Sequence, residues 1–162
     1  MKSRSETDPV AQLKAWMHAD IPLTRHIDVR ISHYDQDSLT LSAPLSANSN
    51  HKGTAFGGSL FSLAVLAGWG LLSLKLEERN LQAELVIQDS RVEYLVPVRA
   101  DFSARATLPG ATEFDRFVRM LERRGKARIR LAVVIAQDGN EAVRFEGTFA
   151  AVAKSSCVRP LG

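Results

Sequence analysis

The residues with the clearest chemistry lie in a short loop that leads into an apolar helix. From Asn50 to Leu76 the chain reads NHKGTAFGGSLFSLAVLAGWGLLSLKL, in which polar side chains and glycines precede a nearly unbroken apolar run. The first turn of a helix has backbone N–H groups without partners and carries the positive end of the helix dipole. Gly57, Gly58 and Ser59 form this turn, so we expect a carbonyl oxygen or a phosphate to be held there.

The polar side chains of the loop permit more than one interpretation. Asn50 could orient a water molecule or a carbonyl group, or it could close an Asx turn within the loop. His51 could act as a base near neutral pH, although a solvent-facing loop histidine is the simpler interpretation. The hydroxyls of Thr54, Ser59 and Ser62 have no evident histidine or lysine partner, which favours capping or ligand contacts over nucleophilic catalysis.

The helix that follows, over about 57–76, is apolar on nearly every face. Such a helix must be surrounded by protein or by lipid. The apolar run from Leu60 to Leu74 is shorter than the roughly 18 residues of a membrane span. We therefore expect a central helix wrapped by a sheet, and no membrane association.

The rest of the chain changes between helical and strand spacing. Apolar positions three and four residues apart indicate amphipathic helices, and alternating apolar positions indicate half-buried strands. We expect helices over about 9–19 and 112–123, and strands over about 27–31, 39–45, 84–95, 100–108, 129–135 and 143–151, with a hairpin at Asp138–Gly139. Strands grouped around one buried helix predict an α+β fold with a curved antiparallel sheet.

Composition narrows the classes of function. The chain has 162 residues, a formal charge of +3 and 45% hydrophobic residues, which predicts one globular domain over 1–162. No dense run of Lys and Arg with interleaved aromatics is present, so we do not expect nucleic-acid binding. The single Cys157 excludes an internal disulfide framework, and the polar N-terminus does not resemble a secretory signal. We therefore predict a cytoplasmic protein.

The loop and helix resemble the hotdog-fold thioesterases, and the resemblance covers about Ile27 to Val152. Many members have an Asn, a His-Gly-Gly six residues later, and a catalytic Asp or Glu nine residues after that His. Asn50, Gly57 and Gly58 match this pattern, as does the segment Tyr94-Leu95-x-Pro97 after the helix. Two positions depart from it.

Phe56 stands in place of the histidine, and Val65 in place of the helix carboxylate. The variant TxFGGSLFSL…GWG, with an extra helix before RRGKARI, is most similar to the thioesterase-like domain that follows a GNAT acetyltransferase domain in some bacterial proteins. The resemblance implies the hotdog fold. It does not imply the usual catalytic group, because the residues at those two positions differ.

The resemblance implies hydrolysis of an acyl thioester, of coenzyme A or of acyl carrier protein, at the interface of a homodimer or tetramer. Gly58 N–H would bind the oxyanion with Ser59 N–H beside it, and Asn50 would hold water or substrate. Alternatively, the two glycines only allow the loop and helix to pack closely. The substrate-binding residues would be Thr54, Phe56, Gly57, Ser59, Leu60 and Ser62, with Phe56 and Leu60 lining an apolar acyl pocket.

The missing carboxylate must then come from elsewhere in the chain. Asp89 is our candidate. In the expected strand, Asp89 and Arg91 point to the same face as Leu85 and Ile87. The resemblance implies that this strand lies near the partner's helix in a hotdog dimer. Asp89 could equally pair with Arg91 or cap a loop. Glu93, with the same parity, is the reserve.

A substrate carrying coenzyme A also brings phosphates, and a basic turn could bind them. Arg124, Gly125 and Lys126, with Arg123 beside them, are our candidates because Arg and Lys suit phosphate. The same cations could simply complement the dipole at a helix C-terminus. No separate cofactor and no metal site is expected, since coenzyme A enters as part of the substrate.

Two rival functions remain on the same fold. A non-catalytic module that binds acyl-coenzyme A is favoured by Phe56 and Val65. A hydratase or dehydratase would use a loop histidine with a carboxylate, and His51 is out of register for that role.

Overall fold

Six antiparallel strands form one curved sheet in the computed structural model, which describes residues 8–155. They pair in the order β1-β2-β4-β5-β6-β3, so β1 and β3 are the two edge strands. The bounds are β1 Arg30–Tyr34, β2 Ser38–Ala43, β3 Ala83–Tyr94, β4 Phe102–Thr107, β5 Lys126–Gln137 and β6 Asn140–Ala153. Cys157, the single cysteine of the sequence, lies outside the described residues.

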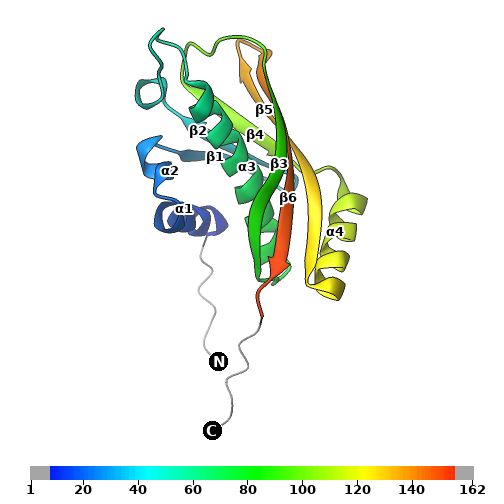
Figure 1. Ribbon diagram of the computed structural model, residues 1–162. Helices are drawn as coiled ribbons and strands as arrows, with labels where there is room; N and C mark the ends of the chain where they lie inside the picture. Colours follow the sequence, from blue (N-terminus) through cyan, green and yellow to red (C-terminus); the bar gives the residue numbers. More distant parts are fainter. Residues whose placement is uncertain (1–7, 156–162) are drawn as a thin grey trace.

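The central helix α3 (Gly57–Glu78) lies along the concave face of this sheet, where it contacts β2, β3, β4, β5 and β6 (Figure 1). Its length and mean hydropathy of 1.6 would suit a membrane span, but 67% of that apolar window is buried inside the protein. Burial by the sheet therefore accounts for its apolar composition. The expected central helix and curved antiparallel sheet are confirmed.

Close approach of the helix to the sheet depends on a glycine. A Cβ atom at Gly68 would come within 2.6 Å of the Phe149 ring on β6. Real Cβ atoms do not approach other atoms this closely, so a larger residue would force the buried Phe149 ring or α3 itself to shift. Gly68 therefore sets the depth at which α3 lies.

At the N-terminus, α1 (Pro9–Asp20) is capped by Asp8 and followed by a short helix, α2 (Leu23–His26). The sequence predicts a strand from 27, but β1 begins only at Arg30. Asp28 has a left-handed backbone with φ of 52°, so Ile27 and Val29 are both buried in a turn. The alternating burial at 27–29, which is typical of a strand, therefore arises here in a turn.

The extra helix α4 (Ala111–Arg124) fills a gap in the sheet. β4 pairs with residues 132–135 of β5, and no other strand of the described chain pairs with the first half of β5 on that side. Phe114, Phe117 and Leu121 are buried where α4 covers it, and Gly125 ends the helix with a left-handed φ of 69°. The expected Asp138–Gly139 hairpin joins β5 to β6, with φ of 52° and 77° at the two residues.

Candidate functional site

The start of α3 presents two backbone N–H groups that the described residues leave without an acceptor. Phe56 occupies the N-cap position and has no side-chain oxygen to offer them. Ser59 N–H and Leu60 N–H both donate to the Phe56 carbonyl, at 3.0 and 3.1 Å. The free pair is thus Gly57 and Gly58, and the expected contribution of Ser59 N–H is already used within the helix.

Two aromatic side chains border these N–H groups. The Phe56 ring lies so close to Gly58 that a Cβ atom there would come within 2.4 Å of it. On the other side, Tyr94 Oη donates to the Gly57 carbonyl at 3.1 Å. Both rings are more than half exposed, at 57% for Phe56 and 54% for Tyr94. The helix terminus therefore opens to solvent between two aromatic walls.

The loop before α3 is held by its own asparagine. Asn50 Oδ1 accepts from Lys52 N–H at 2.9 Å and Thr54 N–H at 3.2 Å, and Asn50 Nδ2 donates to Thr54 Oγ1 at 2.9 Å. These bonds form the Asx turn that was one of the two interpretations. His51 is exposed, as expected of a solvent-facing histidine.

A second asparagine, Asn48, was missed by the sequence reasoning. It is 3% exposed, and its Nδ2 donates to the carbonyls of Ile27 and Pro44 at 3.0 and 2.8 Å. Its backbone carbonyl accepts from Phe56 N–H at 2.7 Å. Asn48 thus anchors the base of the loop, and its Oδ1 is buried without a partner among the described residues. The family pattern matches Asn50, so it gave no reason to expect a role for Asn48.

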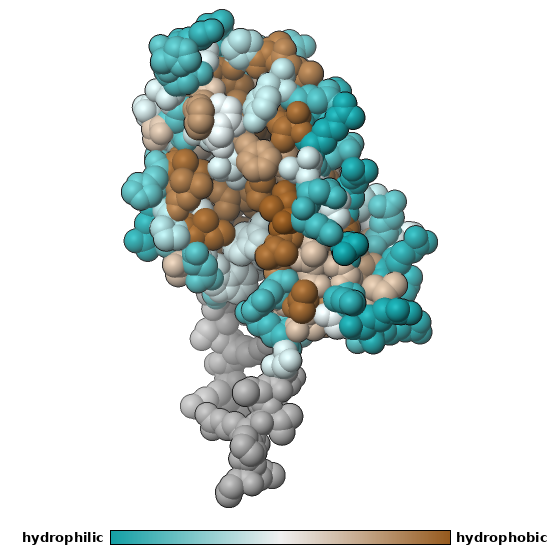
Figure 2. Space-filling view, viewed as in Figure 1, coloured by the Kyte–Doolittle hydropathy of each residue, from teal (hydrophilic) through white to brown (hydrophobic). Residues whose placement is uncertain are grey.

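An apolar groove of about 310 Å³ runs along α3 beyond this terminus. One wall is the open face of α3, another is β3, and the segment around α2 closes the third side. Figure 2 shows apolar side chains gathered around a hollow on this face. The lining residues are Ile21, Leu23, Phe61, Ser62, Val65, Leu66, Trp69, Leu85, Val86, Ile87 and Phe149.

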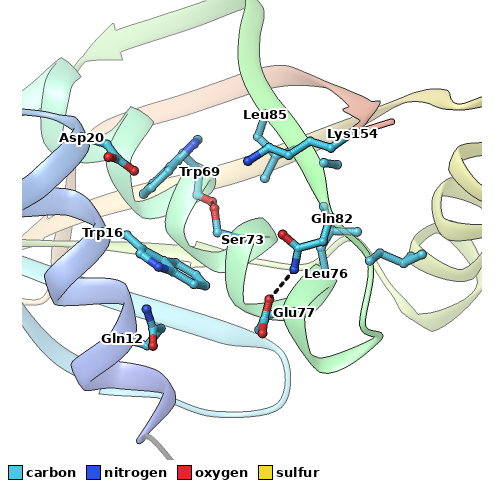
Figure 3. Close-up of a pocket in the computed structure, with 12 residues that line it drawn as sticks. Gln12, Trp16, Asp20, Trp69, Ser73, Leu76, Glu77, Gln82, Leu85 and Lys154 are labelled. Atoms are coloured by element: carbon cyan, nitrogen blue, oxygen red, sulfur yellow. Dashed lines mark hydrogen bonds between the residues drawn. The ribbon is translucent and has the colours of Figure 1, made fainter. Parts of the chain in front are cut away.

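A polar chamber of about 380 Å³ adjoins the groove, between α1, α3 and the start of β3. Trp69 and Leu85 line both spaces. In Figure 3 Trp16 from α1 and Trp69 from α3 lie near one another, and Gln82, Leu85 and Lys154 lie across the chamber from them. Neither tryptophan was singled out from the sequence for a site, because only the packing of α1 on α3 brings them together.

The groove uses a different face of α3 from the one expected. Leu60 is 4% exposed and belongs to the core, whereas Phe61 and Val65 line the groove. Ser62 Oγ donates to the Gly58 carbonyl at 2.8 Å, and the residue lies where the groove begins. Ser59 is buried and Thr54 is half-buried.

Asp89 lies on the opposite face of the sheet from the one that parity predicts. The pairing of β3 with β6 shifts between Ile87 and Asp89, so that Ile87 is opposite the buried Phe149 and Asp89 is opposite Thr148. This bulge places Asp89 and Glu93 on the outer face. Glu93 there contacts Arg91 and Arg144 at 3.1 and 3.9 Å, while the exposed Asp89 carboxylate has no ion-pair partner among residues 8–155.

The basic turn and the helix terminus lie at opposite ends of β3. Lys126 and Glu84 both pair with Val152, which places the turn of Arg124, Gly125 and Lys126 at the beginning of β3. Gly57 contacts Tyr94 at the other end of the strand. Ten residues of strand span about 33 Å, so one chain does not bring its basic turn to its own helix terminus.

A family model described as "Putative thioesterase (yiiD_Cterm)" matches residues 10–153. The chain belongs to this family. The match extends from α1 to the end of β6, so it includes the loop, the groove and the chamber. Membership in the yiiD_Cterm family supports thioester hydrolysis in general and confirms the resemblance to hotdog thioesterases.

Solved structures agree with this assignment. A protein of unknown function from Chlorobaculum tepidum is 35% identical, with a TM-score of 0.86 over 88% of this chain and 93% of that one. A Shewanella oneidensis protein described as a "putative thioesterase" is 27% identical, with a TM-score of 0.80 over 89% of this chain and 97% of that one. A Haemophilus influenzae thioesterase, 21% identical with a TM-score of 0.66 over 85% and 87%, shares the fold.

Proposed function

We propose that this protein hydrolyses an acyl thioester, of coenzyme A or of acyl carrier protein, at the start of α3. The observation that carries the proposal is the pair of Gly57 and Gly58 N–H groups, which have no acceptor among residues 8–155 and lie beside an apolar groove on the same helix. The terminus suits a carbonyl oxygen, and the groove suits an acyl chain. Membership in the yiiD_Cterm family supports the same reaction.

In the proposed reaction, backbone N–H groups stabilise the negative charge that develops on the thioester oxygen. When water attacks the thioester carbonyl, its oxygen becomes negative and the carbon–sulfur bond then breaks to release a thiol. Gly58 N–H, with Gly57 N–H beside it, would bind this oxygen while the helix dipole favours its charge. Asn50 would act by holding the loop in shape, because its amide is engaged there.

A second copy of the chain would complete the site. β3 is an edge strand of 12 residues, and such edges readily pair with another chain. Antiparallel pairing about a two-fold axis would place the beginning of one β3 beside the end of the other. The partner's Arg124 and Lys126 would then approach Gly57 and could bind the phosphates of coenzyme A.

Activation of the water is assigned to the exposed carboxylate of the edge strand. The groove offers no carboxylate or histidine among the residues of 8–155 that line it. Asp89 is exposed on β3, where a second copy would pair, and its carboxylate is not engaged by another described side chain. Because Asp89 stands on the outer face of β3, it would act as the base only where the edge of β3 in the assembled dimer lets its carboxylate reach the partner's helix terminus, and the Asp89→Asn variant tests this. Glu93 is less suited because Arg91 and Arg144 hold it.

The test is release of free thiol from a panel of acyl-coenzyme A and acyl-pantetheine substrates, from short and polar to long-chain. Asp89→Asn should abolish turnover while the mass by light scattering stays that of a dimer. Glu93→Gln serves as the matched control and should retain turnover. Unchanged rates in Asp89→Asn would remove this residue from the reaction, and a monomeric mass would remove the two-fold site.

The rival function is a module that binds the acyl thioester without cleaving it. Val65 favours this rival, because it lines the groove where the family pattern has a carboxylate. Thermal stabilisation by an acyl-coenzyme A without release of thiol would select the binding module.

A further inference from the structure

The chamber between Trp16 and Trp69 gives the groove a polar end. We propose that this chamber receives the far end of a long acyl group, and that it selects a terminus that donates a hydrogen bond, such as an ω-hydroxyl. The inference rests on the proposed function, because it takes the thioester carbonyl to lie at Gly58. Its test uses binding, so it does not depend on cleavage.

The length of α3 sets the length of the acyl group. An α-helix rises about 1.5 Å per residue, which places Trp69 about 16 Å and Ser73 about 22 Å from Gly58 along the axis. An extended chain advances about 1.2 Å per bond, since the three backbone bonds of a residue span 3.3–3.6 Å. About 13 bonds therefore fill the apolar groove, and a chain of about 16 carbons enters the chamber.

The walls change character where the two spaces meet. From Phe61 to Trp69 the groove side chains are apolar, with Ser62 as the exception at its start. Beyond Trp69 the lining adds Gln12, Asp20, Ser73, Glu77, Gln82 and Lys154. A methylene chain suits the first part, and a polar group suits the second.

The chamber contains hydrogen-bond acceptors that the other described residues do not fully use. The Asp20 carboxylate has no hydrogen-bond partner among the described residues, and Glu77 accepts a single bond, from Gln82 Nε2 at 3.2 Å. Ser73 Oγ uses its proton on the Trp69 carbonyl at 2.8 Å, which leaves its lone pairs free. Two carboxylates face one ammonium, that of Lys154.

Asp20 and Glu77 are both exposed, so a methyl terminus beside them would displace part of their water without offering a hydrogen bond in return. A hydroxyl or an ammonium at the same place would donate to Asp20 or Glu77. The chamber thus favours a donor at the end of the chain over a methyl group.

The tryptophans supply the readout, because the chain has two and both line the chamber. The Trp69→Phe variant leaves Trp16 as the sole tryptophan, and the Trp16→Phe variant leaves Trp69. Fluorescence of each variant is titrated with uncleavable S-alkyl-coenzyme A thioethers carrying octyl, hexadecyl or ω-hydroxyhexadecyl chains, below their micelle concentrations.

We expect the Trp16 signal to respond to the two hexadecyl chains and to ignore the octyl chain, which ends near Val65. The ω-hydroxyl analogue should bind about tenfold more tightly than the plain hexadecyl analogue. Asp20→Leu in the same background should narrow or reverse that preference. Trp16→Phe, read through Trp69, provides the control that the groove itself is still occupied.

A Trp16 signal that is silent for every chain, or that responds equally to octyl and hexadecyl chains, would overturn the placement of the acyl end. Equal affinity for the methyl and hydroxyl termini would overturn the selection. If Trp16 responds as expected but no thiol is released from the matching acyl-coenzyme A, the inference stands and the proposed hydrolysis fails.

Discussion

Replacing Gly57 by proline removes one N–H group from the start of α3 and leaves its shape intact. Proline is favoured at the first position of a helix, and Phe56 before it has φ of −65° and ψ of 132°, which suits the residue preceding a proline. A Cβ atom at Gly57 would meet the Tyr94 ring at 3.6 Å, an ordinary contact. Gly57→Ala adds the same Cβ and keeps the N–H, so it is the matched control.

The expected effect follows from the loss of one oxyanion donor. Such a loss costs about 100- to 1,000-fold in rate, or about 3–4 kcal/mol of transition-state stabilisation. We expect kcat/KM for thiol release to fall by about that factor in Gly57→Pro relative to Gly57→Ala, with similar melting temperatures in calorimetry. Equal kcat/KM values in two folded variants would refute a role for Gly57 N–H and leave Gly58 N–H as the sole donor.

The Gly58 position needs a different control, because the Phe56 ring occupies the space of its Cβ atom. Gly58→Ala keeps the N–H but displaces the ring, so it should lower activity by disturbing the site. The double variant Phe56→Ala with Gly58→Ala relieves the clash and should recover activity lost by Gly58→Ala alone. Failure to recover would show that the ring itself, and not the clash, is needed.

Three further predictions concern stability. Glu78→Gln removes the carboxylate that lies 3.1 Å from the Lys75 ammonium, and the Lys75 side chain is only 8% exposed. In urea unfolding, the free energy of unfolding should fall by about 1–3 kcal/mol. Lys75→Met, which removes the buried charge itself, should leave the free energy of unfolding nearly unchanged. Gly68→Ala should cost about 1–3 kcal/mol by overpacking against Phe149, and a gain in stability from the better helix former would contradict the close approach. Asp35 accepts hydrogen bonds from the backbone N–H groups of Asp37 and Ser38 and from the ring of His33, which hold the pKa of its carboxyl well below its usual value. A lowered pKa stabilises the fold at pH values above the unfolded value of about 3.9. The melting temperature of Asp35→Asn should therefore lie below wild type at neutral pH, and the difference should shrink only as the pH falls below about 4 toward the lowered pKa.

The central helix and its sheet could be predicted because their evidence is local. A helix apolar on all faces requires a protein wrapping, and the spacing around 112–123 changes visibly from two to three and four. The start of β1 could not be placed, because Asp28 adopts a left-handed backbone and buries Ile27 and Val29 from a turn. Alternation of apolar residues does not distinguish that turn from a strand.

The site was less predictable than the fold. An apolar helix gives no sign of which side remains open, so Leu60 was expected in the acyl pocket and Phe61 and Val65 line the groove instead. The face of the sheet on which Asp89 lies depends on a bulge in the pairing of β3 with β6. No glycine at this point of the sequence indicates the bulge. The chamber between Trp16 and Trp69 joins elements more than fifty residues apart.

The apolar groove explains why position 65 carries no carboxylate. Val65 lies among Phe61, Leu66 and Trp69, where an ionised side chain would lose its hydration without a partner to replace it. For the proposed hydrolysis, the base would have to stand outside the groove wall, and we propose that the exposed edge strand β3 of a second copy supplies it. In that proposed dimer, the pairing of the two chains and the activation of water would share one surface.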